Sequence, residues 1–182
     1  MRGRIGLIGV GLLLLTGCGE DSASPRAELP PPKVVRLPAA SAGGACRLLD
    51  YPTIEQTIGV RFDVSAASRH GKTDTCVVRT EQARHPELAL SVSPTTADAE
   101  VFADEVAPRG ASTVKGLGKA GYRSVVSAER GSGPGVEVGW LSRDGRLVHL
   151  RYTFPAGDDQ PAASQFASKL VALAKQIDAN GR

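Results

Sequence analysis

The sequence predicts an α+β fold, in which a mostly antiparallel sheet of about six strands is flanked by helices in the order α-βββ-α-βββ-α. The first observation behind this prediction is the order of the elements between residues 50 and 178. The second is that the connections between strands are short, which favours hairpins over parallel crossovers. The third is a hairpin over residues 136–152, in which apolar and polar residues alternate.

The first helix is expected over residues 50–58, because Asp50 can cap its N-terminus and Gly59 can end it. The next segment, residues 60–65, alternates apolar with polar side chains, as a half-buried strand does. Its apolar members are Val60, Phe62 and Val64.

A turn over residues 69–72 leads into a second strand over residues 73–80. A third strand, with Leu88, Leu90 and Val92 on one face, ends at Pro94. Residues 97–106 then predict a helix whose buried side would carry Val101, Phe102 and Val106.

The second half starts with a glycine-rich turn and a strand over residues 122–126, followed by the hairpin. A three-residue turn with a left-handed Gly145 gives the hairpin one apolar face, whereas a two-residue turn would mix apolar and polar side chains. The predicted cross-strand pairs are Trp140 with Val148, Val138 with Leu150, Val136 with Tyr152, and Glu137 with Arg151 as an ion pair. A last helix over residues 160–178 has the apolar stripe Phe166, Leu170, Leu173 and Ile177, and Asp158 and Asp159 can cap it.

The segment Gly116–Gly121 matches the G-x-G-x-x-G pattern of dinucleotide-binding loops. That pattern requires a helix directly after the glycines, so that the helix N-terminus faces the pyrophosphate. Here the strand-like residues 122–126 follow. We therefore expect the glycines to permit a tight turn or a close backbone approach, and we expect no cofactor.

The N-terminus has the organisation of a secretory signal peptide over residues 1–17. Two arginines precede an apolar run over residues 5–15, which is shorter than the roughly 20 residues that a membrane span needs. The run ends in Leu15-Thr16-Gly17-Cys18, which resembles a bacterial lipobox. The resemblance implies cleavage before Cys18, lipidation of its sulfur by diacylglycerol with palmitate-type acyl chains, and anchoring on the extracytoplasmic face of the cell membrane.

Residues 18–44 comprise the lipidated cysteine and a segment rich in proline and alanine, which we expect to be a disordered tether. An alternative is that residues 34–37 add a strand to the domain, although Pro38 follows directly. Residues 45–179 are expected to form a single globular α+β domain.

With Cys18 assigned to lipid, Cys46 and Cys76 remain as one pair in an oxidising compartment. We expect them to form a disulfide, which would stabilise the fold by roughly 3.5 to 4 kcal/mol in the chain-entropy model. The alternative is two buried free thiols.

The charge pattern and motifs exclude several functions. The net charge of the chain is +3, and none of its 22 basic residues is adjacent to another, so nucleic acid is not an expected partner. His70, His85 and His149 do not have the spacing of metal ligands, and no catalytic motif is complete, so we expect no metal site and no catalytic residues.

Four features of residues 46–178 resemble small actinobacterial cell-envelope lipoproteins of unknown function: Cys46-Arg47-Leu48-Leu49, the short helix to Gly59, Cys76 within a strand, and Gly116-Leu117-Gly118 before a strand. The resemblance implies a PsbP-like fold, and it transfers no catalytic residues. The sequence favours a non-enzymatic binding or accessory domain that meets an envelope protein or a small ligand. A sensor or regulator of an envelope signalling system and a cell-wall hydrolase are the alternatives.

Overall fold

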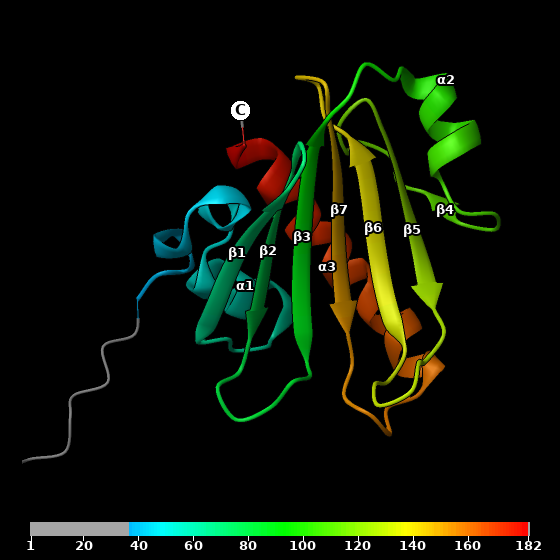
Figure 1. Cartoon of the computed structure of the whole chain (residues 1–182). Helices are drawn as coiled ribbons and strands as arrows, with labels where there is room; N and C mark the ends of the chain where they lie inside the picture. Colours follow the sequence, from blue (N-terminus) through cyan, green and yellow to red (C-terminus); the bar gives the residue numbers. More distant parts are fainter. Residues whose placement is uncertain (1–36, 182) are drawn as a thin grey trace, which may run out of the picture. The chain divides into compact units, whose positions relative to one another are not determined.

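The structure is a computed structural model, and it describes residues 37–181. It confirms the α+β class: a single antiparallel sheet has the strand order β1-β2-β3-β7-β6-β5-β4 (Figure 1). The strands are β1 (Val64–His70), β2 (Thr73–Arg79), β3 (Glu87–Pro94), β4 (Ser112–Thr113), β5 (Ala120–Val126), β6 (Gly135–Leu141) and β7 (Arg146–Thr153). The sheet has seven strands where about six were predicted, because the two-residue strand β4 carries too little pattern to be recognised.

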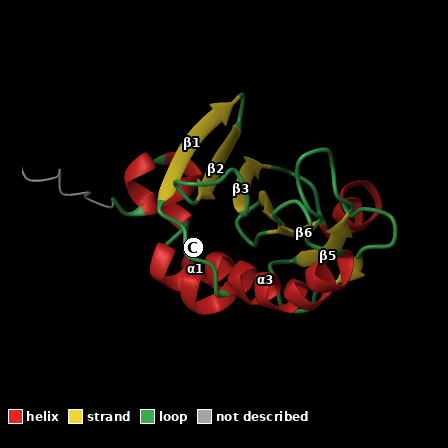
Figure 2. Ribbon diagram, turned by 90° about the horizontal axis from the view of Figure 1, so that it is seen from below, coloured by secondary structure: helices red, strands yellow, loops and turns green. Residues whose placement is uncertain are grey.

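The helices divide between the two faces of the sheet. Two short 3-10 helices, η1 (Ala39–Ala42) and η2 (Gly44–Leu48), precede α1 (Tyr51–Ile58). A single helical turn, α2 (Ala99–Val101), continues into the π-helical turn η3 (Phe102–Val106), and α3 (Gln160–Asn180) closes the chain. Helices α1 and α3 lie along the same face of the sheet (Figure 2), whereas Phe102 of η3 packs on the opposite face against Tyr122.

The helix ends form as the sequence predicts. The Asp50 carboxylate accepts a hydrogen bond from the Thr53 amide at the start of α1, and Gly59 is left-handed at its end. The Asp159 carboxylate likewise accepts from the Ala162 amide at the start of α3. These side chains satisfy backbone donors that have no partner within the helix.

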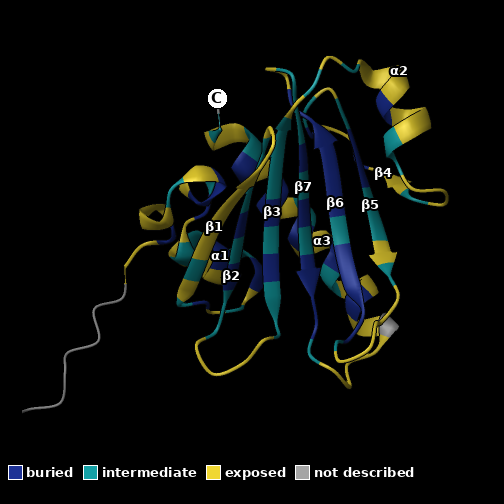
Figure 3. Cartoon of the chain, in the orientation of Figure 1, coloured by how far each residue is buried: buried dark blue, intermediate teal, exposed yellow. Residues whose placement is uncertain are grey.

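The β6–β7 hairpin confirms the predicted register. Trp140 lies opposite Val148, Val138 opposite Leu150 and Val136 opposite Tyr152. Gly145 has φ +80°, and the Ser142 amide donates to the Arg146 carbonyl at 2.8 Å, as the bulged turn requires. The side chains of these three pairs belong to the main core together with the buried residues of α3, and both strands of the hairpin are largely buried (Figure 3).

The first strand was predicted over residues 60–65, but it lies further along the chain. Strand β1 begins at Val64, and residues 60–63 form a loop from which Phe62 enters the core with 3% of its surface exposed. The apolar alternation there marks a buried loop side chain, and β1 itself is mostly exposed because it is an edge strand (Figure 3). Backbone pairing to β2 holds this strand, and such pairing leaves no apolar signal.

The helix predicted over residues 97–106 begins at Ala99, and only its first three residues are α-helical. Asp98 caps it, but after three residues it becomes the π-turn η3, in which the Ala107 amide donates to the Phe102 carbonyl. Phe102 is buried, whereas Val101, predicted to be buried, is 46% exposed. Val101 is the last residue of α2, directly before the π-turn.

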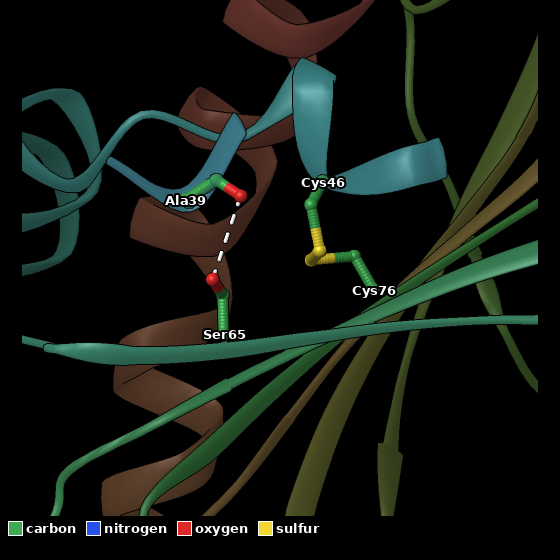
Figure 4. Close-up of a disulfide and its surroundings, with 4 residues drawn as sticks. All are labelled: Ala39, Cys46, Ser65 and Cys76. Atoms are coloured by element: carbon green, nitrogen blue, oxygen red, sulfur yellow. Dashed lines mark hydrogen bonds between the residues drawn. A yellow bond between two sulfur atoms is a disulfide. The ribbon is translucent and has the colours of Figure 1, made fainter. Parts of the chain in front are cut away.

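The Cys46–Cys76 disulfide is confirmed and joins η2 to β2 (Figure 4). Beside it, the Ser65 hydroxyl of β1 donates to the Ala39 carbonyl of η1 at 3.4 Å, and Ala39 is fully buried. The packed part of the chain therefore starts before residue 45, within the segment expected to be tether. Cys18, the signal peptide and the rest of the expected tether lie outside the described residues.

The glycine-rich turn allows a close backbone approach, as the sequence predicted. A Cβ at Gly118, which has φ +57°, would lie 2.2 Å from the Leu141 carbonyl oxygen. Leu117 is buried in the core, and the Asp178 carboxylate of α3 accepts hydrogen bonds from the Gly118 amide and the Trp140 indole. The turn is thus held against α3 and is followed by strand β5, without the helix that a pyrophosphate site needs.

Candidate binding groove beside strand β5

A polar cluster lies on the sheet face opposite α3, and Gly139 makes room for it. Gly139 of β6 pairs with Tyr122 of β5 on one side and with His149 of β7 on the other. A Cβ at Gly139 would lie 2.4 Å from the Tyr122 ring, so the ring covers the space that a side chain would otherwise fill. Tyr122 and His149 can therefore approach each other across β6, near Glu137 two residues along that strand.

The three side chains form one hydrogen-bonded unit. The Tyr122 hydroxyl donates to Glu137 Oε1 at 2.5 Å and lies 3.2 Å from His149 Nδ1. His149 Nδ1 is 3.6 Å from Glu137 Oε1, a contact that becomes an ion pair when the imidazole is protonated. The rings of Phe102 and His149 pack on Tyr122 from η3 and β7.

The surroundings of this cluster shift two pKa values in opposite directions. The hydrogen bond from His149 lowers the pKa of Glu137 below its ordinary value; burial opposes this shift, and the Tyr122 hydroxyl adds to it. Burial, together with the adjacent Glu137 carboxylate, raises the pKa of the Tyr122 phenol well above its usual range. Near neutral pH, Glu137 is therefore an ionised acceptor and Tyr122 a protonated donor.

The sequence predicted a Glu137–Arg151 ion pair, and this interaction is not formed. The two residues are opposite each other in the register, but the Glu137 carboxylate turns toward Tyr122 and His149. The Arg151 guanidinium instead lies 3.6 Å from the Glu129 carboxylate, in the loop after β5. Because Gly139 has no side chain, the Tyr122 ring lies over it and brings its hydroxyl to Glu137. Glu137 therefore accepts from Tyr122 and does not pair with Arg151.

A groove of about 870 Å³ runs along the outer edge of β5. One wall is β5 itself from Arg123 to Val126, and the other is the connection Pro108–Ser112 between η3 and β4. Glu137 and Arg151 line it on the side of the polar cluster, and Ser164 and Ala167 of α3 line it on the helical side. The same connection borders a second cavity of about 650 Å³, between η3 and the glycine-rich turn.

The histidines singled out in the sequence do not gather. His70 ends β1 at the far edge of the sheet, His85 lies in the loop before β3, and only His149 belongs to the cluster. Within residues 37–181, no group of three potential ligands is placed to hold a metal ion. No helix in this part of the chain has the length and apolar character needed to cross a membrane.

The sequence analysis missed the Tyr122–Glu137–His149 cluster. One signal was present: a glycine in the middle of a strand whose apolar neighbours are all large marks a close approach of another group. The sequence alone does not name that group, because the partners come from two different strands.

Comparison with known proteins identifies no family. No protein-family model matches the chain, and no curated protein matches it. Among solved structures, the lipid transfer and protein localization domain of human StarD13 (DLC2) is similar with a TM-score of 0.28 and 13% identity, over 69% of this chain and 93% of that domain. A similarity of this size supports no inference about the fold or the function of this chain.

Proposed function

We propose that this protein is a membrane-anchored extracytoplasmic lipoprotein whose globular domain is a non-enzymatic binding or accessory module of the cell envelope. In this proposal Cys18 carries the lipid, and the groove beside β5 takes up an envelope protein or a small ligand. The groove is the observation that carries the binding role.

The size and lining of the groove support binding. Its volume of about 870 Å³ falls within the roughly 300–1,000 Å³ of ordinary ligand sites. Apolar Val125 and Ala167 lie in it beside charged Arg109 and Arg123. A mixture of apolar surface with a few charged groups is typical of recognition sites.

The protonation states of the cluster favour binding over acid–base catalysis. A general base works best with a pKa near the operating pH, but Glu137 is held ionised by two partners and is a weak base. Tyr122 retains its proton, since its pKa is raised and its hydroxyl is bound to Glu137. The unit is suited to hold one wall of the groove in a fixed geometry.

The anchor is tested by replacing the lipidated cysteine. Cys18→Ser should abolish incorporation of an alkyne-labelled fatty acid and release the protein from the membrane fraction, whereas the nearby control Ser24→Ala should do neither. Membrane association that persists in Cys18→Ser would contradict the anchoring.

The binding role is tested by photo-crosslinking in cells. A photoreactive amino acid at Val125, on the β5 edge, should give a discrete adduct, while the same group at Val64, on the β1 edge, should not. The two sites are matched, because Val125 is 38% and Val64 41% exposed. Equal adducts at both sites, or none at either, would contradict the groove as the binding surface, and turnover of wall material by the purified protein would contradict the non-enzymatic role.

A further inference from the structure

We propose that the free edge of β5 binds an extended acidic peptide segment as an additional antiparallel or parallel strand. The inference rests on the proposed binding function and specifies its ligand: a peptide backbone with carboxylate side chains.

The backbone of β5 has an unpaired stretch that faces the groove. Strand β4 pairs only with Tyr122 and Arg123, and the Val114 amide donates to the Gly121 carbonyl at 2.8 Å. Backbone groups of alternate residues in a strand point to the same side, so those of Val125 point to this edge as well. Within the described residues, no other segment pairs with Val125 on that side.

Proteins usually protect such an edge, and here the protection is incomplete. Charged side chains, prolines or a covering segment normally prevent an edge strand from pairing with another chain. The β1 edge has Arg69 and is partly covered by η1, which is tied to it by the Ser65–Ala39 hydrogen bond. The β5 edge also has an arginine, Arg123, and both edges expose a valine, but beyond β4 the β5 edge borders a groove where β1 is covered by η1.

The walls of the groove leave room for a main chain. Gly110, Ala111 and Ser112 form the wall opposite β5, and Ser127 and Ala128 continue the groove past the end of the strand. These small side chains allow a peptide backbone to lie within hydrogen-bonding distance of β5, in line with β4. A strand added here would take alternate side chains to the two faces of the sheet.

The charges of the groove select an acidic peptide. Its two glutamates are already occupied, Glu137 by Tyr122 and His149 and Glu129 by Arg151. Arg109 and Arg123 line the groove and, among the described residues, form no ion pair. The field that a ligand meets is therefore positive, and carboxylates alternating along a peptide would satisfy it.

The test is a titration of the full chain, purified in an uncharged detergent, with fluorescent peptides of about eight residues that alternate threonine with glutamate or threonine with lysine. The acidic peptide should bind saturably and at least about tenfold more tightly than the basic one. N-methylation of its alternate backbone nitrogens should weaken binding about tenfold, because a methylated nitrogen cannot donate to β5. Amide hydrogen exchange over residues 120–127 should slow in the complex.

A double variant and a control variant test whether the acidic peptide binds at the β5 edge. Arg109→Glu with Arg123→Glu should weaken the acidic peptide about tenfold, whereas the exposed control Arg47→Glu on η2 should leave it within about twofold. Unchanged thermal unfolding of each variant shows that the fold is intact. Equal affinity for both peptides, no effect of N-methylation, or no saturable binding would overturn the inference; an adduct at Val125 in cells together with any of these results would leave the binding function standing and reject only the peptide ligand.

Discussion

The two faces of the hairpin β6–β7 differ in kind, although the same strands build them. On one face, Val138, Trp140 and Leu150 are almost fully buried under α3. On the other, Glu137 and His149 form a polar cluster with Tyr122 that borders an open groove. Strand alternation, with a period of two, places adjacent residues on the core face and on the face that borders the groove.

The two faces have different steric requirements. The apolar face requires large side chains that fill the space beneath α3. The open face requires Gly139, because any Cβ there would displace the Tyr122 ring. Substitutions in the two faces should therefore have different costs and different readouts.

The largest difference should appear between neighbouring residues of β7. Leu150→Ala should lower the free energy of unfolding by about 2–5 kcal/mol, because Leu150 is fully buried and the change leaves a cavity. His149→Ala, one residue earlier and on the other face, should cost less than about 1 kcal/mol. Urea denaturation measures both, and similar losses would contradict the division between the faces.

A second difference is expected within the glycine-rich turn. Gly118→Ala should cost about 3 kcal/mol, because it adds a clash with the Leu141 carbonyl to the strain of a positive φ. Gly116→Ala is the matched control: Gly116 also has a positive φ but its nearest atom is 3.8 Å away, so the cost should be about 1 kcal/mol. Equal losses in thermal unfolding would show that backbone conformation alone fixes the turn.

A third prediction concerns Gly139 and Tyr122. Gly139→Ala should cost about 2 kcal/mol in the wild-type background, because the new methyl group displaces the tyrosine ring. In a Tyr122→Ala background the same change should cost much less, since the ring is gone. A double-mutant cycle measures this coupling, and additive losses would contradict the close approach.

The smallest effect is a dependence of stability on pH. The pKa of Glu137 is lowered in the fold, so its contribution is complete above the ordinary pKa of glutamate and is lost as pH falls through the folded value. Because the group is partly exposed, the loss should be below about 1 kcal/mol. Glu137→Gln should flatten the stability profile below about pH 5, whereas the exposed control Glu100→Gln should not. An unchanged profile in Glu137→Gln would contradict the assigned shift.

Apolar patterning made the central sheet predictable. The pairs of the β6–β7 hairpin follow from the requirement that one face be apolar, and the cap at Asp50 and the stripe on α3 follow from local chemistry. The disulfide followed from the number of cysteines and the expected compartment.

Apolar patterning did not predict the elements whose position is set by backbone geometry. Strand β1 is an edge held by pairing to β2, so its polar residues carry no apolar alternation, and the π-turn after Val101 has no recognisable pattern. The polar cluster could not be predicted, because its members meet through the space above a glycine and not through direct cross-strand pairing.

Oxidation by hydroxyl radicals tests whether the β5 edge is where this protein meets its ligand. It is compared at Val125 and Val64, which are nearly equally exposed on the two edges of the sheet. We expect that, in native membranes, oxidation of Val125 falls several-fold relative to the purified full chain, while oxidation of Val64 stays the same. Equal protection at both valines, or protection at Val64 alone, would contradict it.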